Sequence, residues 1–385
     1  MRGIAILLVL LTHAVWFFRS YPAAWFYFPM HMGWSGVDLF FVLSGFLITG
    51  ILIRTKSAPN RATAFYMRRV LRIFPLYYAV LLVLFIGLHY SWWLRDEFPV
   101  RSWRGWLIYL TYLQNWAFLH NPVFWTRNIV GHFWSLAIEE QFYLIWPWIV
   151  WAVSARWIVR LCIVGMLATL LLRIVFMWHF GPSNWAYQFA LTPTRGEGLL
   201  MGSALAAYSA QFGAVPKRVL EIMTGAGLGI ILLMLAVDPN AFFSEEANVY
   251  RFTVGISGFV LIYGGLVGSS QYAVPYLTRM LNWQWLRSFG KYSYGIYVYH
   301  EPIFNLSRHL AYRTGFPTAF RIRYALAFFL INVAITYFVA SVSFNLFESY
   351  FLRIKDRFRP MRRVRLQEKS EIAGSKQQAA FNENG

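Results

Sequence analysis

The chain has 385 residues, of which 58% are hydrophobic, 20% are aromatic and only 13% are charged. Soluble domains are about 45–50% apolar and about 25% charged, so this composition excludes an ordinary soluble protein. The net charge of +19 would suit nucleic acid, but cytoplasmic loops of membrane proteins also collect Lys and Arg, and we expect no nucleic-acid partner. The single cysteine, Cys162, also excludes a disulfide-stapled chain.

Ten segments meet or approach the composition of a spanning helix, which needs about 20 mainly apolar residues. They are residues 3–18, 35–53, 70–88, 132–153, 157–178, 195–209, 219–237, 252–270, 289–307 and 323–347. A further stretch, 103–119, is apolar but shorter, and polar residues interrupt it. We therefore predict an all-α integral membrane protein with about ten transmembrane helices, in which 103–119 is re-entrant or interfacial.

The charges of the loops predict the orientation of these helices. Residues 54–72 are rich in arginine, and so is the tail 353–365, whereas residues 238–246 carry acids. Because cytoplasmic loops are enriched in Lys and Arg, ten crossings with both termini in the cytoplasm fit this pattern. An eleventh crossing by 103–119 would move the basic tail outside. Residues 308–323 disagree, since they hold four arginines on the expected outer side.

The first span contains one ionisable residue, His13, and begins with Arg2. Ionisable groups inside a span cost about 2.5–3.5 kcal/mol on insertion scales, so each is a candidate for function. The eleven positions between the two residues place His13 roughly 16 Å deeper than Arg2 along a helix. A buried histidine bonded to a neighbouring carbonyl is the alternative interpretation.

Three arginines, Arg68, Arg69 and Arg72, begin the third span. Arginines at a helix start oppose the macrodipole, so helix stabilisation does not favour them. Their guanidinium groups suit the recognition of phosphates at the cytoplasmic boundary. Anchoring of the helix by the positive-inside rule explains them equally well.

The fourth span carries a polar stripe at helical spacing. Its members share one face: His132, Ser135, Glu139 and Tyr143. Glu140 lies about 80° to one side of that face. Two adjacent carboxylates inside a span are candidates for catalysis, and Glu139 is preferred because it continues the stripe. A structural Glu–Arg pair between helices is the alternative.

The ninth span holds His300, which follows a run of tyrosines and precedes Pro302. It is either a second proton-handling group or a polar cap beside the proline. The 18 tryptophans and 23 tyrosines of the chain suit interfacial belts and, in smaller part, stacking on sugar rings.

Taken together, these segments carry a family resemblance. The motifs are Arg2 with His13, residues 36–48 including Asp38, Arg69 with Arg72 before Pro75, residues 134–143, and residues 292–300. In this order they resemble the membrane-bound acyltransferase family 3, whose members acylate hydroxyls of sugars and other acceptors. The resemblance covers about residues 2–350, which we expect to form one transmembrane domain. Residues 351–385 are then a basic and later polar cytoplasmic tail, which we expect to be disordered.

The resemblance implies the substrates and the location. The donor is an acyl-CoA, with acetyl-CoA expected, and no bound cofactor or metal is implied. The acceptor is a carbohydrate or glycolipid, such as an exported or cell-surface polysaccharide, and the protein is a multi-pass protein of the bacterial inner membrane. Family members usually have a few residues, often with Leu-Asp-Gly-Leu, before the first arginine, so we expect an earlier native start. Some members continue into a soluble hydrolase-like domain that completes transfer. Because we see none here, we expect the final step within the membrane domain or with another protein.

The same residues yield a mechanistic hypothesis, in which neutral His13 takes the acceptor proton and Glu139 orients or stabilises the imidazole. Their helices run in opposite directions, and their depths nearly coincide in a core about 30 Å thick, so they meet if the two helices are neighbours. The remaining roles go to supporting residues (Arg2, Asp38, His132, Ser135, Glu140, Tyr143, His300) and to donor-binding residues (Arg68, Arg69, Arg72).

Two alternatives to direct transfer stay open at this point. A covalent acyl-histidine is compatible with the same residues, whereas a serine nucleophile lacks its Gly-x-Ser-x-Gly elbow. A proton-coupled transporter would use His13, Glu139 and His300 as a relay. Transporters often show paired repeats, and we see no such internal similarity in this sequence.

Overall fold

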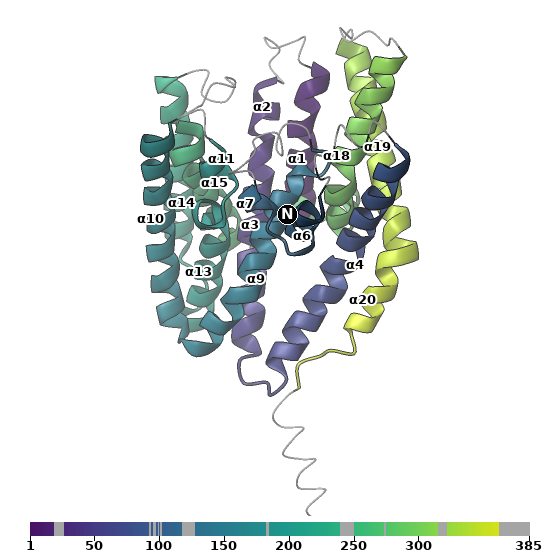
Figure 1. The fold of residues 1–385 in the computed structure, drawn as a ribbon. Helices are drawn as coiled ribbons and strands as arrows, with labels where there is room; N and C mark the ends of the chain where they lie inside the picture. The colour runs from purple at the N-terminus through teal and green to yellow at the C-terminus, as the bar shows by residue number, and fades with distance from the viewer. Residues whose placement is uncertain are drawn as a thin grey trace, which may run out of the picture.

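The computed structural model describes residues 1–18, 27–91, 94, 98, 100, 102–117, 128–181, 185–238, 250–272, 275–314 and 322–361. Across these residues the chain forms helices, turns and irregular segments and no strand. The long helices pack side by side into one bundle with most axes roughly aligned (Figure 1). The all-helical fold class expected from the sequence is therefore confirmed for the described residues.

Each of the ten predicted spans overlaps a helix. The long helices are α1 (Arg2–Phe18), α3 (Gly36–Arg54), α4 (Arg61–Tyr90), α9 (Trp134–Ala152), α10 (Ala155–Phe180), α13 (Glu197–Phe212), α14 (Lys217–Val237), α15 (Ile256–Ser269), α18 (Ser293–Arg313) and α19 (Ile322–Ser343). Shorter helices connect them: α2 (Tyr27–Met32), α6 (Trp103–Leu110), α7 (Gln114–Ala117), α11 (Ala186–Phe189), α12 (Thr192–Arg195), α16 (Pro275–Leu281), α17 (Gln284–Lys291) and α20 (Ser349–Lys355). Two π-helical turns, η4 (Arg251–Gly255) and η5 (Phe344–Glu348), precede α15 and α20.

Six helical stretches of the described chain are long and apolar enough to cross a membrane. They are Pro29–Arg54, Arg61–Leu88, Ala155–Phe180, Lys217–Val237, Arg251–Ser269 and Ile322–Lys355. Their outer faces expose large apolar side chains; Val83, Leu233 and Phe338, for example, are 66–68% exposed. Such surface fits lipid and not water, so the protein is a multi-pass membrane protein. The crossing by α1, α9, α13 and α18, which would make ten, stays a prediction.

The apolar stretch 103–119 does not form one helix over its described part. Helix α6 ends at Leu110, Tyr112 adopts a φ of +56°, and α7 begins at Gln114. The side chain of buried Gln114 donates to the carbonyl of Phe133, at 2.9 Å. Because other elements cover its polar groups, the broken segment satisfies the condition for non-helical backbone at membrane depth.

Helices α3 and α13 make an unusually close approach at the centre of the bundle. A Cβ atom added to Gly202 would lie 2.0 Å from the carbonyl oxygen of Val42, and one added to Gly45 would lie 2.0 Å from that of Leu199. Small residues allow membrane helices to approach to this distance. The pair therefore forms a rigid wall behind the polar residues described next.

A buried ion pair reinforces this wall. The carboxylate of Asp38, on α3, accepts hydrogen bonds from both terminal guanidinium nitrogens of Arg195, and both side chains are buried. The guanidinium carbon of Arg195 also lies 4.9 Å from the ring centre of Phe189 and 5.5 Å from that of Trp34. Asp38, expected as a supporting residue, is thus part of a buried structural ion pair in which both of its carboxylate oxygens are paired.

Candidate functional site

Two cavities inside the bundle contain most of the residues that the sequence singles out. The arginine cavity, of about 90 Å³, is lined by Arg2, Val37, Phe40, Phe41, Leu43, Ser44, Arg69, Arg72, Ile73, Ser135, Leu136, Glu139, Tyr143, Ser293, Tyr294 and Tyr297. The histidine cavity, of about 590 Å³, is lined by Val9, Thr12, His13, Trp34, Val37, Asn128, Gly131, His132, Trp134, Trp185, Phe189, Arg251, Phe252, Tyr297 and Glu301. Val37 and Tyr297 line both, so the two cavities meet at these side chains.

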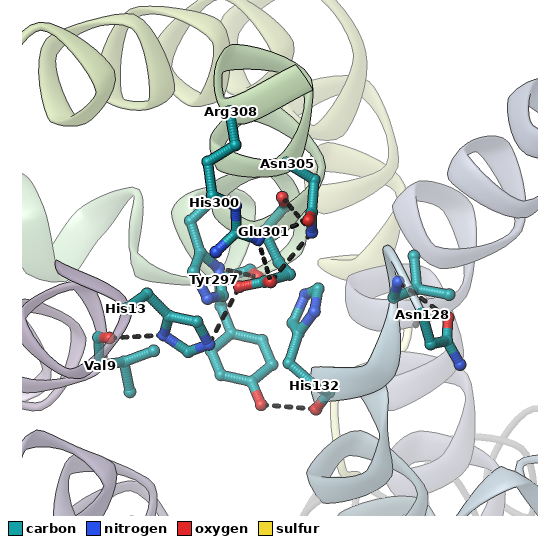
Figure 2. Close-up of polar contacts among 10 residues, drawn as sticks. Val9, His13, Asn128, His132, Tyr297, His300, Glu301, Asn305 and Arg308 are labelled. Carbon is teal, nitrogen blue, oxygen red and sulfur yellow. Dashed lines mark hydrogen bonds and ion pairs between the residues drawn. The ribbon is translucent and has the colours of Figure 1, made fainter. Parts of the chain in front are cut away.

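His13 is held from both sides of its ring. Its Nδ1 lies 2.8 Å from the carbonyl oxygen of Val9, one turn earlier on α1, and its Nε2 lies 3.0 Å from a carboxylate oxygen of Glu301 on α18 (Figure 2). A carbonyl and a carboxylate are both acceptors, so each ring nitrogen faces a group that needs a proton. An imidazolium that forms when His13 accepts a proton would therefore be paired with the carboxylate.

Glu301 is itself fixed by two further residues of α18. Its second oxygen accepts from the amide of Asn305 at 2.9 Å and from the guanidinium of Arg308 at 3.1 Å (Figure 2). These residues follow Glu301 by four and seven positions, which places all three on one helix face. Arg308 also packs over the ring of Trp16, at 5.5 Å, and so joins α18 to α1. The carboxylate is therefore held against His13.

Two more histidines complete the group. The ring centre of His300 lies 4.6 Å from that of His13 and 4.6 Å from that of His132. His300 is fully buried, and its Nδ1 lies 2.6 Å from the carbonyl oxygen of Tyr297. The hydrogen bonds of the described residues leave its Nε2 and both ring nitrogens of His132 unused. Three imidazoles and one carboxylate can accept, hold and release protons in this space.

The same group has the residue types of a metal site. His13, His300 and Glu301 each offer one ligand atom, and these atoms lie within 4.8 Å of one another. However, the His13–Glu301 contact is of hydrogen-bond length, and Arg308 already supplies positive charge to the carboxylate. The contacts as they stand favour proton handling over the binding of a cation.

The expectation that His13 and Glu139 share one cavity is wrong. Glu139 lines the arginine cavity, His13 lines the histidine cavity, and the carboxylate beside His13 is Glu301. The depth argument required α1 and α9 to be neighbours at this level. Instead α18 packs against α1 there, as the His13–His300 ring contact shows.

The polar stripe of α9 is divided between the cavities. Ser135 contacts the hydroxyl of Tyr297 at 2.5 Å, and that hydroxyl donates to the carbonyl of His132 at 2.7 Å. His132 faces the histidine cavity, whereas Tyr143, hydrogen-bonded to Ser44, faces the arginine cavity. Glu140 faces neither, and lines a separate pocket beside Arg69 and Tyr112.

The three predicted donor-binding arginines lie close together at one end of α4. Arg69 and Arg72 line the arginine cavity, and both also line a second cavity, of about 160 Å³. Arg68 lines only this second cavity, together with Arg61 and Lys355. We call it the basic pocket.

Sequence reasoning missed Glu301, although it directly follows the predicted His300. The signal was an acid inside an apolar span, with Asn305 and Arg308 at helical spacing behind it. Arg195 was missed because it lies at the edge of an apolar segment. Tyr297 lies within the motif of residues 292–300, but its position between two cavities depends on the tertiary fold.

Comparison with known proteins places this sequence in a family. The Acyltransferase domain of the Acyl_transf_3 family matches residues 1–341. Peptidoglycan O-acetyltransferase OatA of Listeria monocytogenes is 32% identical over 353 residues, which cover 84% of this chain and 54% of that protein. O-acetyltransferase OatA of Staphylococcus aureus is 25% identical over 333 residues, which cover 82% of this chain and 52% of that protein.

The chain spans about half the length of these curated relatives. No solved structure matches it significantly. Since the family match extends from the first residue through α1 and α18 almost to the end of α19, it includes every residue of the two cavities. The chain belongs to the membrane-bound acyltransferase family 3.

Proposed function

We propose that this protein is an O-acyltransferase that moves an acyl group, expected to be acetyl, from acyl-CoA to a hydroxyl of a glycan. The observation that carries the proposal is the meeting of two cavities, one cationic and one histidine-lined, at Val37 and Tyr297. Such a pair accommodates a phosphorylated donor on one side and a hydroxyl acceptor on the other. The relatives are named as O-acetyltransferases, which supports the same reaction.

The arginine cavity suits the donor. Arg2, Arg69 and Arg72 supply guanidinium groups, which bind phosphate through paired hydrogen bonds. The rest of the lining is largely apolar, for example Phe40 and Leu43, and fits the uncharged arm that carries the thioester. Glu139 lies among these cations, where it balances their charge, so we now assign it to the donor side.

The histidine cavity suits the acceptor. Its volume of about 590 Å³ is that of a ligand site, and aromatic rings of Trp34, Trp134 and Phe252 line it. Aromatic faces pack well against the apolar faces of sugar rings. Peptidoglycan, named for the Listeria relative, is the first acceptor to test.

The chemistry assigned to this site centres on His13 and Glu301. Neutral His13, with its Nδ1 proton held by the Val9 carbonyl, accepts the acceptor's proton at Nε2 as the hydroxyl oxygen attacks the thioester carbonyl. The new proton then lies between Nε2 and Glu301, whose charge stabilises the imidazolium. Cleavage of the C–S bond releases CoA thiolate, which takes up that proton. A base of this kind contributes about 10²–10⁴ in rate.

We also propose the topology that such a reaction needs. The α3–α4 loop and α20 lie at the same end of the bundle, since Asn60 bonds to the backbone of Arg359 and Met361 (Figure 1). This end gathers basic residues and is therefore assigned to the cytoplasm of a bacterial cell, with both termini inside and ten crossings. Acyl-CoA would enter from this side.

The decisive experiment uses purified protein with acetyl-CoA and soluble peptidoglycan fragments. CoA release and the acetyl ester on the glycan are measured together, the second by mass spectrometry. His13→Ala is expected to abolish transfer and to leave acetyl-CoA binding unchanged. His179→Ala, which removes an exposed histidine of α10, serves as the matched control. Transfer by His13→Ala at the wild-type rate would refute the assigned chemistry.

The rival transporter hypothesis draws no support from the relatives.

A further inference from the structure

The basic pocket gathers more positive charge than the arginine motif of α4 alone supplies. Five cationic side chains line its 160 Å³: Arg61, Arg68, Arg69, Arg72 and Lys355. No acid of the described chain lines the pocket, although a carboxylate oxygen of Asp356 lies 3.8 Å from Arg68. Like charges at half-buried positions repel each other more strongly than in water. The pocket is therefore built for a multiply charged anion.

One of these cations comes from beyond the family match, which ends at residue 341. Helix α20 carries Lys355 to the pocket, and the segment after it is fixed to the start of α4. The amide of Asn60 donates to the carbonyl of Arg359 at 3.0 Å, and its oxygen accepts from the backbone N–H of Met361 at 2.9 Å. Arg68 adds a contact of 3.5 Å to the carbonyl of Lys355. The C-terminal segment thus forms one wall of the pocket.

The five cations fall into two sets. Arg69 and Arg72 line both the basic pocket and the arginine cavity, whereas Arg61, Arg68 and Lys355 line the basic pocket alone. An anion in contact with the first set lies toward the interior, where the acyl arm would extend. An anion in contact with the second set lies farther from the reaction centre. A donor with two separated phosphate groups fits both sets at once.

We propose that Arg61, Arg68 and Lys355 form a separate subsite for a terminal phosphomonoester of the donor, the 3′-phosphate of CoA. Arg69 and Arg72 would hold the diphosphate. A phosphomonoester carries a charge of about −1.5 to −2 at pH 7, more than either phosphate of a diester-linked diphosphate, and so matches a set of three cations. This inference rests on the proposed acyl-CoA donor and adds the group by which the protein recognises it.

The test compares the dissociation constants of acetyl-CoA and 3′-dephospho-acetyl-CoA by calorimetry, with the full chain in phosphatidylcholine nanodiscs. The wild type should prefer acetyl-CoA by about tenfold or more, since charge-assisted hydrogen bonds contribute about 1.5–3 kcal/mol. Lys355→Gln should weaken the binding of acetyl-CoA but not that of 3′-dephospho-acetyl-CoA. The ratio of the two dissociation constants should then be near one. Arg72→Gln should weaken both ligands and preserve the ratio.

Two further variants separate the effect of lost charge from the effect of a displaced C-terminal segment. Arg357→Gln removes an exposed cation of the same segment that does not line the pocket, and should preserve the ratio. Asn60→Ala releases the C-terminal wall without changing charge, and should lower the ratio even if Lys355→Gln proves unstable.

The outcomes are distinct. Equal affinity of the wild type for both ligands overturns the subsite and leaves the proposed function intact, whereas binding of neither ligand overturns both. A phosphomonoester lipid is the other source of this chemistry, so phosphatidic acid is added to the discs in a further arm. Competition by phosphatidic acid would assign the pocket to lipid and overturn the proposal. Unchanged binding of acetyl-CoA supports it.

Discussion

Glu301 changes the account of the reaction at the scale of single residues. The free-energy cost of an ionisable group in lipid singles out His13 on α1. Its carboxylate partner, however, lies on α18 and not on α9. Glu301 receives two hydrogen bonds from its own helix and one contact from His13, so its orientation is fixed before any substrate binds. Preorganised groups of this kind stabilise charge that develops in a transition state.

The first prediction concerns this pair. Glu301→Gln is expected to lower turnover about a hundredfold, because the imidazolium loses its counter-charge, and to leave the dissociation constant of acetyl-CoA unchanged. The double variant, His13→Ala with Glu301→Gln, should have a turnover little lower than that of His13→Ala alone. The effects of substituting residues that act as a unit are not additive. Steady-state kinetics and donor binding measure both effects. Glu221→Gln, an exposed carboxylate on α14, is the control. Losses that multiply would show that the two residues act separately.

The second prediction concerns the buried pair of Asp38 and Arg195. Asp38→Ala leaves an unpaired buried cation and should destabilise the protein by about 3–5 kcal/mol. Replacing both partners together, by Asp38→Leu and Arg195→Met, should recover much of that loss, because no charge is then left alone. Thermal unfolding in detergent compares the variants. A double variant that is less stable than Asp38→Ala would contradict this account.

At the scale of elements, the helices follow from the sequence and their neighbours do not. Apolar runs of about 20 residues locate helices well, because the bilayer requires backbone hydrogen bonds to be satisfied within each segment. All ten predicted segments overlap helices. Which helix lies beside α1 depends on side-chain packing between distant segments, and no pattern within one segment records it. His13, Arg69 and Arg72 could therefore be found from the sequence, whereas the separation of Glu139 from His13 could not.

The third prediction belongs to the contact between α3 and α13. Gly202→Ala should lower stability by about 1–3 kcal/mol, because the added Cβ would lie 2.0 Å from the carbonyl oxygen of Val42 and force the helices apart. Gly229→Ala is the matched control, since nothing lies within 4 Å of its added Cβ. It should be neutral or stabilising, as alanine favours helix. Equal effects of the two changes in thermal unfolding would contradict the close approach.

At the scale of the whole molecule, the charge at the two ends of the bundle sets its orientation in the membrane. The α3–α4 loop, the start of α4 and α20 bring basic residues to one end (Figure 1). The acids expected outside at 238–246 lie mainly beyond the described residues, with Asp238 at the last described position of that loop. Most of the tail predicted to be disordered, 362–385, also lies outside them, but residues 351–355 complete α20 and Met361 bonds to Asn60.

The fourth prediction tests this orientation by cysteine labelling. Cys162 is buried, and its replacement by alanine gives a background without thiols. In that background Ser57→Cys, in the α3–α4 loop, should be protected in intact cells from a membrane-impermeant maleimide, whereas Thr314→Cys, after α18, should react. Both should react in opened membranes. The reverse pattern in intact cells would place the arginine motif outside and remove acyl-CoA as its ligand.

The position of Val37 and Tyr297 between the two cavities has a consequence for proton movement across the membrane. If the two cavities open toward opposite faces of the membrane, as the proposed topology requires, a continuous path between them would let protons leak across it. The hydroxyl of Tyr297 is held by Ser135 and by the carbonyl of His132, so its side chain is fixed between the two cavities. We therefore expect Tyr297 to limit proton movement between the two cavities. Tyr297→Ala in liposomes with an internal pH dye should raise proton leakage before any substrate is added.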